Sequence, residues 1–406
     1  MDDSKLFEWV RHDPAGEWWV SRWNLLPELE RAIYLPRKVI IKDTTLREGE
    51  ETPNVNMTIE DKLTIARALS EMGIPEADVG YAGAVERDRR LAKEVKAEGL
   101  KLKLAAHAYA LSPNFGQELD RISEAGVEII QLVLHPAPIP GYGRKDYVLK
   151  LTEAVKWSKD RGLFTVFMPV LTNWDLDFCR ELFQGAVEGG VDRFCTAGLG
   201  CLHVTAYKHM IKWIKTSFPG IQIGVHVHND YGLATACAVA SVEAGAEVVD
   251  LAVNGMCDRS GIAALEEVAM ALTVLYGMDL GIKLDRLTEL SGLVRRIAGV
   301  PLQPWKPIVG ENIFIQNTDS HIVAEMKGGS SIMNSFAPSM VGGRSNILFG
   351  PHTLSGQGLR VKIETMGLSA TEEQIADLLR EMEDLLKTQK AISEDEVAQL
   401  AKRKIR

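Results

Sequence analysis

The 406-residue sequence lacks the features that would tie it to a membrane, a nucleic acid or an oxidising compartment. Its five cysteines include no CxxC pair, so neither a zinc knuckle nor a disulfide framework is indicated, and reduced thiols in a cytoplasmic protein fit best. No apolar run approaches the roughly 20 residues of a membrane-spanning helix. The polar start, Met1–Lys5, is unlike a signal peptide. A net charge of −9 argues against nucleic acid or an anionic membrane as partner.

What is present is typical of a globular protein, with 46% hydrophobic and 25% charged residues. Residues 1–37 stand apart because they hold four of the eight tryptophans: Trp9, Trp18, Trp19 and Trp23. So many aromatic side chains are rarely left in water. We therefore predict a Trp-rich N-terminal extension that packs on the main domain or on a second subunit.

From residue 38 to about 281, short apolar runs alternate with helical patterns. Eight runs are predicted strands: Val39–Lys42, Ala77–Gly80, Leu102–His107, Glu128–Leu134, Phe164–Val170, Asp192–Thr196, Ile221–His228 and Glu247–Asn254. The predicted helices between them include Ile59–Met72, Val85–Glu98, Asn114–Ala125, Val148–Arg161 and Asp175–Glu188, and several stop at a glycine, such as Gly73 or Gly189. This alternation predicts an α/β fold, a (β/α)8 TIM barrel over 38–281. An open doubly wound sheet fits less well, since no GxGxxG follows the first strand.

After residue 281 the alternation ends. The helical stretch Leu284–Ala298 leads to a section rich in glycine, serine and asparagine, Gly328–Gly358, flanked by His321 and containing His352. Two capping boxes, Ser369–Glu372 and Ser393–Glu396, predict closing helices. We predict that 282–406 is a small, mostly helical subdomain whose long loop is functional and contributes to an active site.

Two sequence motifs carry the chemistry. His226 and His228 stand at i and i+2 near the end of an apolar run, so both imidazoles point to the same face of a strand. The first strand runs directly into Asp43–Glu50, which contains Arg47 and Glu48. Barrel active sites lie at the carboxyl ends of the strands. Glu48 and the two histidines then form a metal site with open positions, and Arg47 offers a cation for an oxyanion.

These motifs resemble those of a known family. Asp43–Glu50, His226–Ala234 and Val253–Gly261 are similar to the three signatures of the DRE-TIM metallolyases, which include 2-isopropylmalate, homocitrate and citramalate synthases and hydroxymethylglutaryl-CoA lyase. Lys306–Asn312, Asp319–His321 and Gly350–His352 resemble the subdomain that follows the barrel in the synthases. The resemblance covers about residues 38–400.

The resemblance implies roles for several residues. Arg47 would stabilise the enolate or oxyanion, while Glu48, His226 and His228 would bind one divalent metal ion: zinc, manganese or magnesium. Gly261-Ile262 stands where many members carry a Gly-Asn pair with a metal-binding asparagine, a variant that homocitrate synthases share. His321 would reach into the neighbouring subunit's site as an acid/base group. That implies a homodimer with subdomain exchange.

The chain also departs from the family pattern. Val170 stands at the position of the catalytic glutamate on the fifth strand, Val166 stands at or near an arginine position, and Met333 replaces a tyrosine. Glu51 replaces a glutamine, and Cys195-Thr196 replaces an Asp-Thr pair. A wall of Val166, Met168, Val170 and Trp174 suits an apolar substrate end, although Val166 and Met168 are as readily barrel-filling core.

Other groups must then move the proton or contact the substrate. His107, Tyr109 and His135 are candidates for the proton, although each alone is more often a satisfied residue at a strand end. We interpret Cys257 as a small buried residue. Thr196 would hold a substrate carboxylate and Glu51 would act in catalysis. The substrate contacts are predicted to be His107, Val166, Met168, Val170 and Asn254.

Our leading hypothesis is an acyltransferase of the isopropylmalate/homocitrate synthase type. It would condense an acyl-CoA, most simply acetyl-CoA, with a 2-oxo acid, to give a 2-hydroxy dicarboxylic or alkylmalate-type product and CoA. One alternative is a carbon–carbon lyase acting on a 3-hydroxyacyl-CoA or a 4-hydroxy-2-oxo acid, which the missing glutamate and tyrosine favour. A third is a non-catalytic paralogue, against which the three inferred metal ligands argue.

Overall fold

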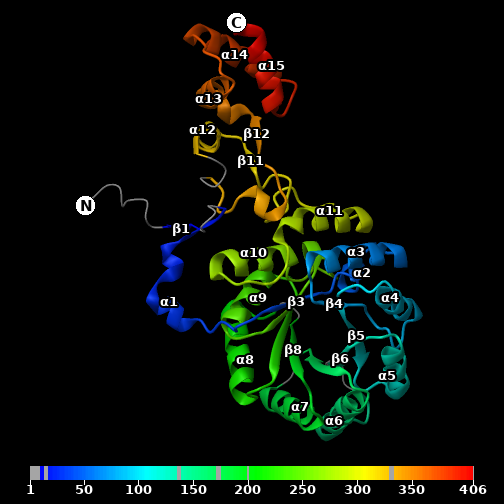
Figure 1. Cartoon of the computed structure of the whole chain (residues 1–406). Coiled ribbons are helices and arrows are strands. Elements are labelled where there is room, and N and C mark those ends of the chain that lie inside the picture. The colour runs from blue at the N-terminus through cyan, green and yellow to red at the C-terminus, as the bar shows by residue number, and fades with distance from the viewer. Residues whose placement is uncertain are drawn as a thin grey trace. The chain divides into compact units, whose positions relative to one another are not determined.

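The computed structural model describes residues 10–12, 17–134, 139–170, 175–198, 201–328 and 333–405 (Figure 1). The chain divides into two compact units. The barrel unit comprises Pro27–Lys283 and Glu289–Pro301, and the second unit comprises Met1–Leu26, Leu284–Thr288 and Leu302–Arg406. Within the described ranges, no helix combines the length and apolar character needed to cross a membrane.

The barrel unit contains the predicted TIM barrel. Eight parallel strands close in the order β10-β3-β4-β5-β6-β7-β8-β9. The strands are β3 (Ile40–Asp43), β4 (Glu76–Asp78), β5 (Lys103–Tyr109), β6 (Ile129–Leu134), β7 (Phe164–Pro169), β8 (Arg193–Gly198), β9 (Gln222–Val227) and β10 (Val248–Leu251). Each overlaps one of the eight predicted runs, because buried parallel strands are apolar on both faces.

Helices α3 to α10 surround the closed sheet (Figure 1). The helices of this part of the chain are α1 (Pro27–Ala32), α2 (Glu48–Glu51), α3 (Ile59–Met72), α4 (Glu86–Ala97), α5 (Phe115–Glu124), α6 (Arg144–Asp160), α7 (Leu176–Gly189), α8 (Val204–Ser217), α9 (Ala234–Glu243), α10 (Leu265–Tyr276) and α11 (Leu287–Ala298). Helix α3 has the predicted bounds because a Thr58–Asp61 capping box starts it and Gly73, at φ 93°, ends it. The predicted stop of α7 is off by one residue: Gly190, at φ 92°, caps the helix, and Gly189 is its last residue.

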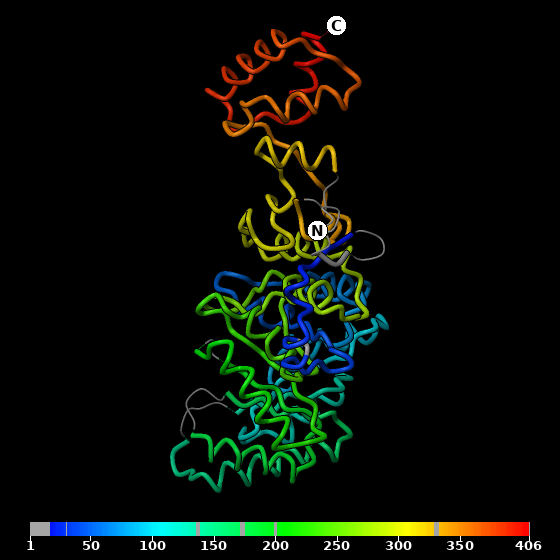
Figure 2. Tube along the Cα trace, turned by 90° about the vertical axis from the view of Figure 1, so that its left-hand side faces the viewer, coloured from blue at the N-terminus to red at the C-terminus, as the bar shows by residue number. Residues whose placement is uncertain are grey.

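The second unit is largely helical at its C-terminal end, as predicted. It holds a hairpin of β1 (Val10–His12) and β2 (Trp19–Ser21), and a small sheet of β11 (Ile315–Gln316), β12 (Asn346–Phe349) and β13 (Ile392–Ser393). Its helices are α12 (Asp319–Gly328), α13 (Gln357–Thr365), α14 (Glu372–Leu385) and α15 (Glu394–Lys404), and the last three, orange to red in Figure 2, gather in one cluster. Thr371 caps α14 with Gln374, so the predicted capping box at Ser369 was wrong, while the predicted box at Ser393 is present.

The N-terminal tryptophans belong partly to this second unit. Trp19 donates its indole N–H to the carbonyl oxygen of Asn334 at 3.1 Å, and Trp18 forms a bridge with Phe336. Trp23 remains 69% exposed, and Trp9 lies outside the described residues. The compact second unit therefore takes in the chain as far as Leu26, and α1 joins the barrel unit.

Candidate active site

A cleft of about 260 Å³ lies at the carboxyl ends of the barrel strands. Nine residues that the sequence predicts to be functional line it: Arg47, Glu48, Glu51, His107, Tyr109, Met168, Val170, His226 and His228. Six further residues complete its lining: Tyr81, Val133, Ala197, Gly198, Asp258 and Arg259. Residues from strands across the barrel therefore meet in one polar and apolar cleft.

Arg47 and Glu48 follow β3 directly and lie almost fully buried at the base of this cleft. The Nε of Arg47 donates to Oδ2 of Asp78 at 2.9 Å, and its Nη1 forms ion pairs with Glu48 and, at 3.4 Å, with Glu51. The Nη2 atom has no hydrogen-bond partner among the described residues. Carboxylates therefore hold the guanidinium through Nε and Nη1, while the N–H groups of Nη2 remain available to another group.

His226 lies on β9, two strands from β3 in the barrel order, and His228 follows the end of β9. Nε2 of His226, on β9, lies 3.3 Å from Oε1 of Glu48, while its Nδ1 lies 3.7 Å from Oδ2 of Asp250. The rings of His226 and His228 have centroids 5.1 Å apart. Burial alone would raise the pKa of Glu48, but the charges of Arg47 and His226 outweigh it and lower that pKa to about 2. The Glu48 carboxylate is therefore ionised at neutral pH.

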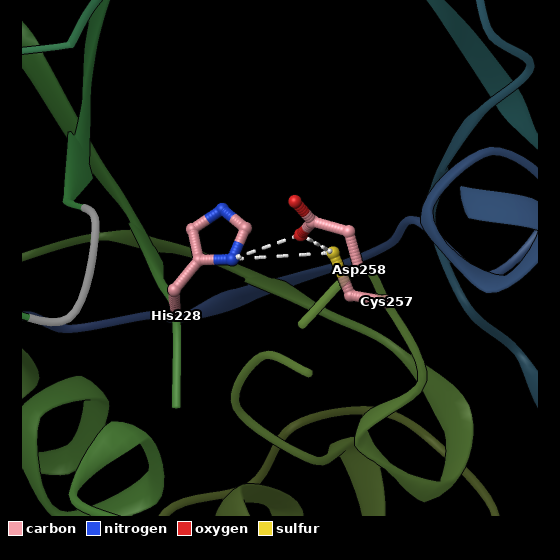
Figure 3. Close-up of side chains that lie close together, drawn as sticks. All are labelled: His228, Cys257 and Asp258. Atoms are coloured by element: carbon pink, nitrogen blue, oxygen red, sulfur yellow. Dashed lines mark hydrogen bonds and ion pairs between the residues drawn. The ribbon is translucent and has the colours of Figure 1, made fainter. Parts of the chain in front are cut away.

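Cys257 and Asp258 were not predicted as site residues, yet the structure places them beside His228 (Figure 3). The thiol of Cys257 donates to Oε2 of Glu48 and lies 3.0 Å from Oδ1 of Asp258. Burial, followed by the Glu48 charge, raises the pKa of Cys257. The interpretation of Cys257 as a small buried residue holds for its burial, at 2% exposure, but misses these polar contacts.

A buried polar network supports the cleft from below. Nζ of Lys42 donates to Oδ2 of Asp250 at 2.6 Å and to Oε1 of Gln131 at 2.5 Å. Nε2 of His107 lies 2.8 Å from Oδ2 of Asp78 and also contacts the Gln131 amide. Burial and the charge of Arg47 lower the pKa of His107, which keeps the imidazole neutral. His107 is thus already engaged through Nε2, and only its other nitrogen is left for a substrate.

The apolar wall is smaller than the sequence predicts. Met168 and Val170 line the cleft beside Val133 and Ala197. Val166 lies two residues before Met168 on β7 and is fully buried. It packs in the barrel core with Ala105, Ile129 and Cys195. Its predicted substrate contact is therefore not present, because β7 places it below the floor of the cleft.

Two other predicted contacts are not brought into the cleft. On β8, Cys195 and Ala197 face the barrel interior, so Thr196 faces the helices with Phe194, whose ring makes an edge-to-face contact with Phe183 of α7. Asn254 lies in the 3₁₀ helix η4 (Val253–Gly255) at φ 62°, and its amide bonds Ser291 on α11. Thr196 is therefore on the wrong strand face to hold a carboxylate, and Asn254 holds the third motif against a helix.

Of the remaining predicted residues, His321 lies on α12 in the second unit, and its role in a partner's site stays a prediction. His135 and Trp174 lie outside the described residues. Tyr109 is 48% exposed in the cleft lining and stacks on Tyr81, with ring centroids 5.7 Å apart. Tyr81 follows β4 directly, and only its position after a strand end could have marked it.

The donor atoms in the cleft fit a divalent cation. Two groups have all their donor atoms within 4.8 Å of one another: His228, Cys257 and Asp258, and Glu48, Glu51 and Cys257. The predicted set of Glu48, His226 and His228 does not form such a group among the described residues, although Glu48 and His226 are adjacent. Imidazole donors suit zinc, while carboxylate donors suit magnesium and manganese.

Comparisons with known proteins agree with this geometry. The sequence model of the HMGL-like family matches residues 38–294. The chain is 32% identical to a probable 2-isopropylmalate synthase of Ignicoccus hospitalis, covering 94% of this chain and 95% of that protein. It is 32% identical to homocitrate synthase AksA of Methanocaldococcus jannaschii (88% and 89% covered) and 34% identical to the putative (R)-citramalate synthase CimA of Archaeoglobus fulgidus (89% and 74% covered).

Among solved structures, the hydroxymethylglutaryl-CoA lyase of Pseudomonas aeruginosa is similar, with a TM-score of 0.56 and 19% identity, over 66% of this chain and 95% of that one. At this identity the likeness supports the barrel fold alone. The three synthases are named for three different products at nearly equal identity, so sequence identity does not choose among those products.

Proposed function

The chain belongs to the HMGL-like family, and we propose that it catalyses a Claisen-type condensation of an acyl-CoA, most simply acetyl-CoA, with a 2-oxo acid. The product would be a 2-hydroxy dicarboxylic or alkylmalate-type acid, with release of CoA. The observation that carries this proposal is the cleft itself. It brings together Arg47, Glu48, His226 and His228 at the carboxyl end of the barrel.

Glu48, His226 and His228 would hold one divalent metal ion, which, when bound, would polarise the ketone of the 2-oxo acid. Oδ2 of Asp250 lies 3.7 Å from Nδ1 of His226, so a carboxylate faces that ring without forming a hydrogen bond to it. The donor set accommodates zinc, manganese or magnesium.

During the condensation, Arg47 would stabilise the developing negative charge and Glu51 would accept the proton. Arg47 is held by Asp78 and Glu48, so its Nη2 donor is oriented before substrate arrives and can stabilise an enolate oxygen. Glu51 lines the cleft 3.4 Å from Arg47, and burial raises its pKa. A carboxylate of raised pKa is a stronger base, so Glu51 is our choice to take the α-proton of the acyl-CoA in place of the missing strand-five glutamate.

Met168, Val170 and Ala197 support a narrower proposal about the 2-oxo acid. They form an apolar part of the cleft lining, which suits an apolar side chain better than a second carboxylate. We therefore propose a 2-oxo acid with a short apolar side chain and not a dicarboxylate such as 2-oxoglutarate.

The deciding assay measures free thiol released from acetyl-CoA with a panel of 2-oxo acids that differ in side-chain length and charge. Thiol release with apolar 2-oxo acids, lost in Glu48→Gln, supports the proposal. The same protein is assayed in reverse with 3-hydroxyacyl-CoA and 4-hydroxy-2-oxo acids. Cleavage of these without any condensation would replace the proposal with the lyase alternative, and no turnover in either direction would favour a binding protein.

Glu51→Gln tests the proton acceptor separately. A general base works only when deprotonated, so kcat/KM of the wild type falls as pH drops through the raised pKa of Glu51. We expect Glu51→Gln to lower kcat by about 10²- to 10⁴-fold and to remove this acidic limb of the profile. A variant that keeps the limb would show that another group takes the proton.

We further propose a cytoplasmic homodimer in which His321 completes the partner subunit's cleft. Mixed dimers of an Arg47→Lys protomer and a His321→Ala protomer test this, because one of their two clefts would have both native residues. In a random 1:1 mixture half of the dimers are mixed, so recovery of about a quarter of the wild-type activity supports exchange, while two inactive parents that stay inactive when mixed contradict it.

A further inference from the structure

The loop between Gly255 and Gly261 carries two side chains that no predicted role explains. Cys257 and Asp258 project from it toward His228, as Figure 3 shows. Sγ of Cys257 lies 3.0 Å from Oδ1 of Asp258 and 4.0 Å from Nδ1 of His228, and the latter two atoms are 3.5 Å apart. Three different donor types therefore converge on one point at the edge of the cleft.

These separations match the edges of a tetrahedral metal site. Sulfur, nitrogen and oxygen ligands at 2.0–2.3 Å from zinc lie about 3.3–3.6 Å from one another in that geometry. The three observed separations, 3.0, 3.5 and 4.0 Å, spread around this range. Movements of a few tenths of an ångström would let all three atoms contact one cation, with Glu48 as a further neighbour of the sulfur.

The loop is closed on itself, so its side chains are held in place. The amide of Ile262 donates to the carbonyl of Gly255 at 3.0 Å, and that of Gly261 donates to Asp258 at 2.9 Å. A Cβ on Gly261, at φ 84°, would lie 2.1 Å from the Gly255 carbonyl oxygen, so only glycine permits this closure. Cys257 packs on Ala252 and Ile262 on its other side, which fixes the direction of its sulfur.

We propose that Cys257 supplies a thiolate ligand to the divalent cation of this cleft, beside His228 and Asp258, and that the site thereby selects zinc or cobalt over magnesium. This inference rests on the proposed function, because it concerns the same cation. On binding, the sulfur–metal bond forms and the thiol proton, which Glu48 accepts as a hydrogen bond, leaves to solvent. Thiolate favours soft cations, while magnesium prefers an all-oxygen shell.

Cobalt(II) reports the ligand directly, because a thiolate bound to cobalt gives an intense charge-transfer absorption in the near ultraviolet, distinct from the weaker visible bands of the ion. We expect the cobalt-loaded wild type to show both features. Cys257→Ser should keep the visible bands and lose the charge-transfer band. The matched control is Cys237→Ser, which changes a buried cysteine on α9 whose sulfur lies 3.8 Å from the carbonyl oxygen of Leu202, and it should retain both features.

The second readout is metal affinity in competition. Cys257→Ser should weaken zinc binding by about 10- to 100-fold and leave magnesium binding unchanged. If Cys257→Ser fails to fold, X-ray absorption of the zinc-loaded wild type decides the question, since a bound sulfur is seen in the zinc scattering.

The outcomes separate this inference from the proposed function. Cobalt that binds with visible bands but without a charge-transfer band in the wild type overturns the thiolate ligand and leaves the metal site intact. A charge-transfer band that persists in Cys257→Ser overturns it as well. A protein that binds no divalent cation contradicts both the inference and the metal-dependent function.

Discussion

On strands β9, β10, β3, β4, β5 and β6 the barrel interior is charged or polar near the cleft, whereas on β7 and β8 it is apolar. The charged side holds Lys42, Asp78, His107, Gln131 and Asp250, all at most 3% exposed. The apolar side holds Val166, Met168, Cys195 and Ala197, and its inward charge, Arg193, lies at the start of β8 and pairs with Glu76.

The two sides are built on different physics. Each buried charge costs desolvation energy, so the charged side is stable only because every member has a partner in contact. The apolar side depends on packing, which tolerates a change of shape at a smaller cost. The charged residues of the cleft therefore lie on the side where a single substitution leaves a buried partner unpaired. In our proposal, the substrate side chain contacts the apolar side, where single substitutions cost less.

The largest effect is expected where one buried partner is removed. Lys42→Met leaves Asp250 without its cation and should lower the free energy of unfolding by about 3–5 kcal/mol. Urea denaturation measures it, and Lys387→Met, which breaks an exposed pair with Asp384, should cost under about 1 kcal/mol. The double variant Lys42→Met/Asp250→Leu should recover most of the loss. Equal losses in the two single lysine variants would erase the distinction between the two sides.

Next comes the arginine at the edge of the charged side. Arg47→Lys keeps the charge but cannot contact Asp78, Glu48 and Glu51 at once, so the oriented Nη2 donor is lost. We expect kcat to fall by about 10²- to 10³-fold with little change in folding. Steady-state kinetics measure the effect, with Arg67→Lys, an exposed arginine paired with Glu60 and Glu98, as the unaffected control.

A smaller and more selective effect is expected on the apolar side. Val170→Ala enlarges the wall, so the ratio of kcat/KM for a longer over a shorter apolar 2-oxo acid should rise by about tenfold. The surface change Val85→Ala should leave that ratio unchanged. An equal loss of rate for every 2-oxo acid would mean that Val170 does not contact the substrate side chain.

The smallest effect is expected at Cys195, where the apolar side of the barrel interior meets the charged side. Cys195 belongs to the apolar cluster, yet its sulfur lies 3.8 Å from Oδ2 of Asp250. Cys195→Val preserves size and should change stability by less than about 1.5 kcal/mol. A loss as large as that of Lys42→Met would assign β8 to the charged side.

The strands and helices could be predicted from the sequence, because an apolar run or a terminal glycine determines the structure of the residues next to it in the chain. The metal motif could also be predicted, since His226 and His228 are two residues apart at the end of one strand and Glu48 lies shortly after the end of another. Thr196 was misplaced because its face depends on the pleat of β8, which fixes it with Phe194 against the helices. Asp78 and Cys257 were missed because a lone acid or thiol gains meaning only from partners across the barrel.

Asn254 links the active-site loop to a later part of the chain. Its side-chain amide donates to the carbonyl of Ser291 at 3.1 Å and accepts from the Ser291 hydroxyl, while its backbone N–H is held by Glu266. During synthesis, a nascent chain that has emerged only through β10 has neither anchor. We therefore expect the barrel to close on the ribosome before its catalytic loop is fixed, so that the site is completed only after α11 has left the exit tunnel.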